Sequence, residues 1–217
     1  MTEAIERLPR RRLLRAGALL PLGLAWPAWP AWAADALAAT PGQTEGPFYP
    51  VRIPDDSDND LVQVRGAAAR ALGTVTHVQG RVLDTAGRPI PAARVEIWQC
   101  DAHGIYDHPN QDGLARRDQA FQGFGQTVSS ADGGYGFRTI RPVAYSGRTP
   151  HIHVKVFAPD GRKLTTQMYI AGEPENERDG LYRSIPVSLR ERVLVKLEPA
   201  NGLEQGALAG TFDVVLG

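Results

Sequence analysis

The sequence predicts an all-β fold, a β-sandwich of about eight short strands joined by long loops. From residue 75 onward, short windows of alternating apolar and polar residues recur, which is the pattern of half-buried strands. In ARVEIWQCD, for example, Val95 and Ile97 alternate with Arg94 and Glu96. The chain carries 23 Gly and 17 Pro in 217 residues, which favours a turn-rich sandwich over a helical bundle.

Strand-like segments follow one another along the chain with turns between them. The turn TAGRPIP separates the first two, a tight turn at 131–134 interrupts the third, and a Pro-Asp-Gly turn ends the fourth. Residues 173–191 are polar and irregular and are expected to contain one helical turn. In chain order, the segments are 76–84, 93–101, 125–140, 151–161, 163–172, 192–199 and 210–217.

The N-terminus has the layout of a secretory signal, with a basic run, a short apolar stretch and small residues that end at Ala33. The run RRRLL at 10–14 resembles a twin-arginine export signal. A transmembrane anchor is the alternative, but prolines interrupt the apolar stretch, which makes a span of about 20 residues poor. We expect cleavage after Ala33, an exported protein in the periplasm or outside the cell, and no stable membrane span after cleavage. The expected organisation is an export signal at 1–33, an N-terminal arm at 34–74 and a sandwich domain at 75–217.

Composition excludes several classes of function. Lys plus Arg equals Asp plus Glu at 24 each, which gives no support for nucleic-acid binding. The single cysteine, Cys100, rules out an intrachain disulfide and is expected to be a small core residue. The length of the chain suits a single domain of ordinary size.

Two histidines stand out in the segment RTPHIHVKV. Side chains alternate faces along a strand, so His151 and His153 share one face while Ile152 and Val154 share the other. Two imidazoles on one face lie close enough to share a metal ion. Two polar residues on the solvated face of a sheet would give the same pattern. Further ligands nearby are therefore needed to distinguish a metal site from a solvated pair.

Two tyrosines follow predicted strand ends, in loops rich in Gly, Pro and Asp. Tyr106 lies in CDAHGIYDHPN and Tyr145 in IRPVAYSGRTPHIH, and such loops often carry binding residues. For a single tyrosine, an ordinary half-buried aromatic is the simpler interpretation. Phenolate is a hard oxygen donor that forms only beside a strong Lewis acid, so tyrosine together with histidine suits ferric iron better than zinc.

Four segments of the chain resemble the intradiol ring-cleavage dioxygenases, the family of protocatechuate 3,4-dioxygenase and catechol 1,2-dioxygenase. In the family's order, they are QTEGPFYP, GRVLDTAGRPIPAARVEIWQCDAHGIYDH, GGYGFRTIRPVAYSGRTPHIHVKV and LTTQMYI. The resemblance implies a β-sandwich whose loops carry a non-haem ferric ion, Fe(3+), held by Tyr106, Tyr145, His151 and His153. It also implies that Arg148 and Gln167 belong to the site.

The resemblance implies intradiol cleavage of a catechol-type aromatic diol by O2 to a cis,cis-muconate-type diacid. Tyr106 and His153 are expected to stay on the iron, while Tyr145 leaves it and accepts a proton. Arg148 would stabilise negative charge, and Gln167 would orient Arg148 or the bound oxygen. The expected partners are thus the diol and O2, with a homo-oligomer as a further expectation.

Two alternatives remain open from the sequence. His103 and His108 flank Tyr106 and could join His151 and His153 in a four-histidine set, which leaves both tyrosines unexplained. The segment at 80–98 also resembles transthyretin-like sandwich modules, which would make the protein a non-catalytic binding module without a metal.

The sequence says least about the substrate. The loop SGRTP after Tyr145 is shorter than in well-known protocatechuate enzymes, which favours an open site for catechol or a substituted catechol. Arg52, Arg141 and Lys155 are candidates for binding a substrate carboxylate, although surface charge is the simpler role for each. The segment around Gly46, Pro47 and Phe48 resembles the family segment that lines the pocket.

Overall fold

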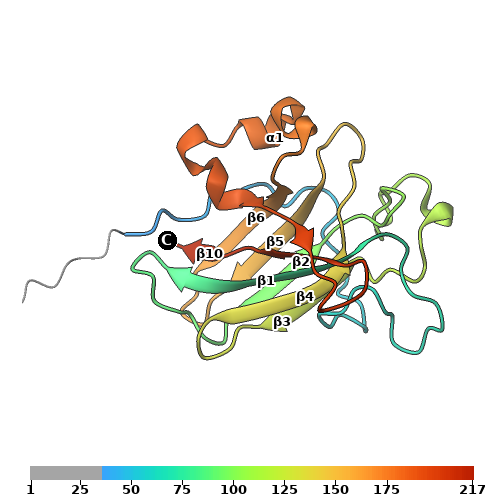
Figure 1. The fold of residues 1–217 in the computed structure, drawn as a ribbon, viewed down its shortest axis with the longest axis horizontal. Coiled ribbons are helices and arrows are strands. Elements are labelled where there is room, and N and C mark those ends of the chain that lie inside the picture. The colour runs from blue at the N-terminus through green and yellow to red at the C-terminus, as the bar shows by residue number, and fades with distance from the viewer. Residues whose placement is uncertain (1–35) are drawn as a thin grey trace, which may run out of the picture. The chain divides into compact units, whose positions relative to one another are not determined.

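The computed structural model describes residues 36–217, so the export signal expected at 1–33 lies outside the described residues. Two mixed five-stranded sheets pack face to face (Figure 1). The predicted all-β sandwich is therefore confirmed. Within the described part of the chain, no helix is long and apolar enough to cross a membrane.

The first sheet is built around the long strand β1 (Val75–Asp84). Strand β4 (Gly134–Ile140) runs antiparallel to β1, while β9 (Leu208–Thr211) and β10 (Val214–Leu216) run parallel to it. Strand β8 (Glu198–Pro199) extends the sheet by pairing with β9. β1 thus has partners along both edges.

The second sheet has the order β3–β2–β5–β6–β7. Strands β3 (Phe124–Val128), β2 (Arg94–Trp98), β5 (His151–Phe157) and β6 (Lys163–Ile170) are antiparallel to their neighbours, and β7 (Leu194–Val195) runs parallel to β6. As a result, the start of β5 lies beside the ends of β2 and β6. The helical pieces outside the sheets are α1 (Gly180–Arg183) and 3₁₀ segments at Leu114–Arg116, Pro174–Arg178 and Val187–Val193.

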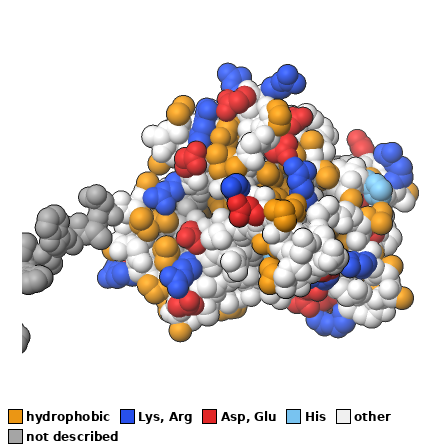
Figure 2. All heavy atoms as spheres, viewed as in Figure 1, with side chains coloured by type: hydrophobic (Ala, Val, Ile, Leu, Met, Phe, Trp, Pro, Cys, Tyr) orange, Lys and Arg blue, Asp and Glu red, His pale blue; other side chains and the backbone are white. Residues whose placement is uncertain are grey.

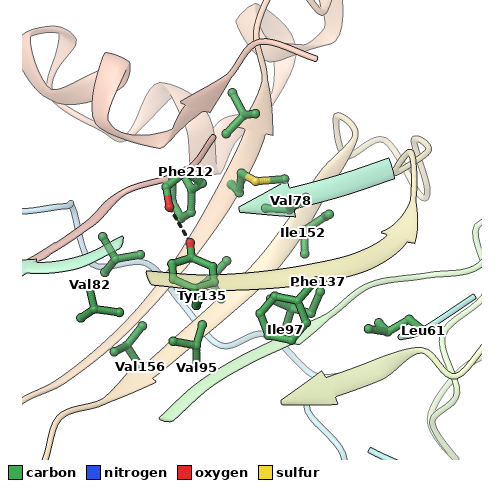
Figure 3. Close-up of a cluster of buried hydrophobic side chains, with 14 of the residues drawn as sticks. Leu61, Val78, Val82, Val95, Ile97, Tyr135, Phe137, Ile152, Val156 and Phe212 are labelled. Atoms are coloured by element: carbon green, nitrogen blue, oxygen red, sulfur yellow. Dashed lines mark hydrogen bonds between the residues drawn. The ribbon is translucent and has the colours of Figure 1, made fainter. Parts of the chain in front are cut away.

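Two segments expected as single strands are each divided in the structure. The segment 192–199 holds β7 in the second sheet and β8 in the first, so the chain crosses between sheets at residues 196–197. The segment 210–217 is broken between β9 and β10, where Phe212 turns into the core and its carbonyl oxygen accepts a hydrogen bond from Tyr135 Oη (Figure 3). Tertiary contacts override the strand pattern at both places.

The core fills the space between the two sheets. Buried side chains of the first sheet meet buried side chains of the second, as Figure 3 shows. The labelled members include Val78, Val82, Tyr135 and Phe137 from the first sheet and Val95, Ile97, Ile152 and Val156 from the second. The apolar face predicted for β5 is therefore the core face. Its other face is free to carry the two histidines.

The described part of the arm, residues 36–74, contains no helix or strand but is held to both sheets by hydrogen bonds. Backbone hydrogen bonds join Thr40 to Val215 and Gln43 to Thr165, at distances of 2.9 and 2.8 Å. Tyr49 Oη donates a 2.8 Å hydrogen bond to Glu96, which is only 1% exposed although strand alternation placed it opposite the core. The arm thus covers part of the outer face of the second sheet.

Charges of both signs are interspersed on the molecular surface. In the view of Figure 2, Lys and Arg side chains lie among Asp and Glu side chains. This face has no continuous basic patch of the kind that binds nucleic acid.

Candidate metal centre

The candidate site lies where β5 begins. His151 pairs across the sheet with Tyr169, and His153 pairs with Gln167 on one side and Trp98 on the other. Both imidazoles are almost completely buried, at 1% and 2% exposure. The two histidines are therefore not on a solvated sheet face, which was the simpler of the two interpretations of the pattern.

The geometry of the two imidazoles fits neutral ligands. Their Nε2 atoms lie 3.3 Å apart, and His151 Nδ1 lies 2.6 Å from the carbonyl oxygen of Thr149. Because a carbonyl only accepts, His151 Nδ1 carries the proton and Nε2 presents its lone pair. Burial, followed by the positive charge of Arg148, lowers the pKa of His151 to about 4. Burial, His151 and Arg148 also lower the pKa of His153, so both rings are neutral at pH 7.

Both tyrosines reach the same place. The ring centre of Tyr106 lies 5.1 Å from that of Tyr145 and 6.1 Å from that of His153. The ring centre of Tyr145 lies 5.6 Å from that of His151. Four rings from three segments of the chain therefore surround one point.

The donor atoms at this point fit a hard cation. Tyr106 Oη is buried and has no hydrogen-bond partner within residues 36–217, while the Nε2 atoms of His151 and His153 face each other at 3.3 Å. Burying a polar group without a partner is costly, and a cation bound by the phenol oxygen would offset that cost. Burial raises the pKa of Tyr106 and Tyr145, so a phenolate here requires a strong Lewis acid. Two phenol oxygens and two imidazole nitrogens suit ferric iron.

The four-histidine alternative is not assembled. His103 is exposed, and His108 Nδ1 accepts a hydrogen bond from the backbone N–H of Asn110. Within the described residues, no three His, Cys, Asp or Glu side chains gather as a possible metal site. Among residues 36–217, the tyrosines are the further ligand candidates that converge with the histidine pair.

A buried aspartate shapes the loop that presents Tyr106. Asp101 Oδ1 accepts hydrogen bonds from the backbone N–H groups of His103 and Ile105, and its Oδ2 accepts one from Asp118, at 2.7–2.9 Å. Aspartate favours such local turns because its short carboxylate reaches nearby N–H groups. The turn directs Tyr106 from the end of β2 toward the histidines.

A tight hairpin turn places Tyr145 beside Arg148. Ser146 and Gly147 both have positive φ, at 45° and 75°, which matches a type I′ turn. Arg148 N–H donates a 2.7 Å hydrogen bond to the carbonyl of Tyr145, and the two residues form a β-bridge. The short SGRTP loop is therefore an ordered turn that holds the tyrosine and the arginine on the same side.

Arg148 is held by two neighbours. Its Nη2 donates to Gln167 Oε1 and its Nε donates to Asp179 Oδ2, both at 2.6 Å. Burial opposes the charged form of Arg148, but the hydrogen bond and charge of Asp179 raise its pKa overall. The structure thus brings Arg148 and Gln167 together. Sequence reasoning missed Asp179, whose local signal is its position as the N-cap of α1.

Aromatic side chains enclose the site. Trp98 stacks on His153 with ring centres 4.7 Å apart, and Phe48 stacks on Tyr106 at 4.6 Å. An added Cβ at Gly46 would lie 3.5 Å from His153, so this part of the arm also touches the site. Of the arm residues suspected of lining the pocket, Gly46 and Phe48 border the site.

Two cavities adjoin the site, each lined by one of the two tyrosines. One of about 300 Å³ is lined by Tyr145 and Arg148, with Glu175 and Arg178 at its wall. The other, of about 270 Å³, is lined chiefly by Phe48, Pro50, Arg52, Trp98, Tyr106 and Phe124.

All three cations suspected of binding a carboxylate have an acidic partner, and that of Arg52 is the exposed Asp55 at 3.4 Å. Arg141 forms an ion pair with Glu173, and Lys155 forms one with Glu45. Arg52 is exposed and lines the cavity beside Tyr106 rather than the cavity beside Tyr145. None of the three lines the cavity that contains Arg148.

Comparison with known proteins gives the family. The family model described as Dioxygenase matches residues 44–217, which include all four rings and Arg148. The chain belongs to the intradiol ring-cleavage dioxygenases. Family enzymes use non-haem Fe(III), which agrees with the donor set described above.

Several relatives within the family are similar over most of the chain. The protocatechuate 3,4-dioxygenase beta chain of Burkholderia cepacia is 34% identical over 178 residues, which cover 78% of this chain and 76% of that protein. The catechol 1,2-dioxygenase of Acinetobacter baylyi is 32% identical, with 82% of this chain and 62% of that protein covered. This chain spans 46–64% of the length of the hydroxyquinol and catechol relatives.

A solved structure supports the same assignment. The dioxygenase domain of a dioxygenase carbohydrate-binding protein fusion from the cellulolytic bacterium Streptomyces sp. SirexAA-E superposes with a TM-score of 0.65 at 34% identity. The match covers 82% of this chain and 98% of that one. The two-sheet sandwich is therefore the fold of an intradiol dioxygenase.

Proposed function

We propose that this protein is a ferric intradiol dioxygenase that cleaves a catechol-type diol between its two hydroxyls with O2. The observation that carries the proposal is the convergence of Tyr106, Tyr145, His151 and His153 on one buried point. The expected product is a cis,cis-muconate-type diacid. The transthyretin-like alternative rested on 80–98 alone and gives no reason for these four rings to meet.

Tyr106, Tyr145, His151 and His153 would hold the iron. When bound, the ferric ion supplies a Lewis acid that withdraws electron density from a coordinated diol and makes its ring attackable by O2. Tyr145, half-buried at the cavity, would accept a diol proton at Oη. The other residues orient the substrate and exclude water.

Arg148 would stabilise the negative charge that develops on the substrate. Its guanidinium is always cationic and lines the same cavity as Tyr145. Gln167, fully buried, fixes the guanidinium by accepting from Nη2 and is itself held by donating to the carbonyl of Thr44 at 3.2 Å. The positive charge is thus preorganised next to the proton acceptor.

The proposed substrate is catechol or a substituted catechol, with protocatechuate among the candidates. Relatives named for protocatechuate, hydroxyquinol and catechol are 31–34% identical to this chain at similar coverage, so identity does not separate them. Apart from Arg148, the cavity beside Tyr145 has one acidic and one basic residue at its wall, Glu175 and Arg178. This mixed wall supports a site without a dedicated carboxylate pocket.

The proposed place of action is outside the cytoplasm. Support comes from the signal-like pattern of residues 1–33 and from the fusion of the Streptomyces dioxygenase domain to a carbohydrate-binding protein in a cellulolytic organism. An aromatic diol from lignin-like material would fit such a location.

A substrate panel tests the proposal. Oxygen uptake is measured on the iron-loaded mature protein with catechol, protocatechuate, hydroxyquinol and alkyl- or chloro-catechols, and the products are identified by mass spectrometry. We expect muconate-type products from several diols. Extradiol products would overturn the mechanism, and a preference for protocatechuate by orders of magnitude would refute the open site.

A further inference from the structure

We infer that Asp179 is a positioning residue that fixes the orientation of Arg148 for ring cleavage. This inference rests on the proposed function for its catalytic consequence, but its structural part stands on contacts alone. Asp179 was not among the residues that the sequence or the family resemblance pointed to. Its side chain is completely buried, at 0% exposure.

Asp179 holds two consecutive residues with one carboxylate oxygen. Oδ2 accepts the 2.6 Å hydrogen bond from Arg148 Nε and a 3.0 Å hydrogen bond from the backbone N–H of Thr149. Charge-assisted hydrogen bonds of this kind are stronger than neutral ones. The side chain and the following peptide of Arg148 are therefore fixed by the same atom.

The other carboxylate oxygen fixes Asp179 itself. Oδ1 accepts from the backbone N–H groups of Leu181 and Tyr182, at 2.9 and 3.0 Å, and so caps α1. A carboxylate at a helix N-cap is itself stabilising. Asp179 is thus a rigid link between Arg148 and the helical segment that follows β6.

The contacts leave one end of the guanidinium available. Asp179 accepts a hydrogen bond from Nε of Arg148, and Gln167 accepts one from Nη2. Nη1 makes no hydrogen bond within residues 36–217. Arginine presents five N–H donors in a planar fork, so fixing two nitrogens sets the direction of the third. We assign to Asp179 the role of directing Nη1 of Arg148 toward the negative charge of the reacting diol.

The connection continues to the metal ligands. Thr149, whose N–H is held by Asp179, also carries the carbonyl oxygen that lies 2.6 Å from His151 Nδ1. Thr149 Oγ1 donates a 2.7 Å hydrogen bond to Asn176, so Thr149 has a second anchor that does not involve Asp179. Removing the charge of Asp179 should therefore disturb Arg148 while His151 stays in place.

Asp179→Asn is the first test. The amide keeps an oxygen for the helix cap, but its NH2 group would face the donors Arg148 Nε and Thr149 N–H. We expect kcat to fall by about 10- to 100-fold, the range seen when supporting partners of site residues are removed, with iron content unchanged and KM changed less than kcat. Asp160→Asn is the matched control, because Asp160 binds the Nε of Arg162 and its backbone N–H in an exposed turn.

A double-mutant cycle separates positioning from general loss of stability. In the Arg148→Gln background, Asp179→Asn should have little further effect on kcat, because coupled residues are not additive. Multiplicative losses would overturn the inference, as would loss of iron in Asp179→Asn, which would place Asp179 in support of the metal ligands. If Asp179→Asn does not fold, Asp179→Ser, which also caps a helix, takes its place in the cycle.

Crystal structures of the iron-loaded wild type and the Asp179→Asn variant give a readout that does not depend on activity. We expect Arg148 to leave Gln167 in the variant. An unmoved guanidinium would refute the positioning role. If the wild type cleaved no diol, the proposed function would fail while the position of Arg148 would still decide this inference.

Discussion

Removing one hydroxyl, in the variant Tyr49→Phe, should measurably destabilise the protein. Tyr49 Oη donates the 2.8 Å hydrogen bond to Glu96, whose carboxylate is 1% exposed and whose other polar partner within residues 36–217 is Arg94 Nε at 3.3 Å. A hydrogen bond to a charged group contributes about 1.5–3 kcal/mol, and losing it leaves a buried carboxylate less satisfied. For a domain of this size, that corresponds to a decrease in Tm of roughly 3–12 °C.

Calorimetry of Tyr49→Phe beside a matched control tests this magnitude. Tyr182→Phe is the control, because Tyr182 is buried and its hydroxyl donates no hydrogen bond within the described residues. Adding Glu96→Gln to Tyr49→Phe should recover part of the loss, since the neutral amide is cheaper to leave unpaired. A Tm for Tyr49→Phe equal to that of the control would refute the claim that this hydrogen bond anchors the arm.

Two further predictions concern the metal ligands and acid stability. The variants His153→Ala and Tyr106→Phe should lose most of the iron, whereas Tyr145→Phe should keep some iron yet turn over slowly. Metal analysis checks this prediction, and full iron retention in His153→Ala and Tyr106→Phe would contradict the ligand assignment. Hydrogen bonds from Arg138 lower the pKa of Glu204 to about 2. The stability that this interaction contributes is present above pH 4.5 and lost as the pH falls toward 2, so the Tm difference between wild type and Glu204→Gln should shrink over that range.

Strand alternation predicted the part of the site that lies on a regular element. The H-x-H pattern in β5 placed His151 and His153 on one face and Ile152 on the other, and the structure has the same arrangement. Alternation alone did not show that the histidine face is buried. That burial comes from loops and from the arm, which are distant in sequence.

The tyrosines and Asp179 illustrate what local pattern leaves undetermined. Nothing in the spacing of Tyr106 and Tyr145 shows that their loops meet; the family resemblance supplied that pairing, and the structure brings the rings to 5.1 Å. Asp179 contacts Arg148 across 31 positions of sequence, so its role depends on how the segment after β6 folds back. Likewise, β7 and β8 separate because each fits a different sheet.

Metal analysis combined with visible absorption of the purified full-length protein tests the central claim most directly. The account predicts stoichiometric iron and a tyrosinate-to-iron charge-transfer band that weakens when Tyr106 or Tyr145 is replaced by Phe. A colourless protein that holds stoichiometric zinc, and that stays inactive after iron loading, would contradict it.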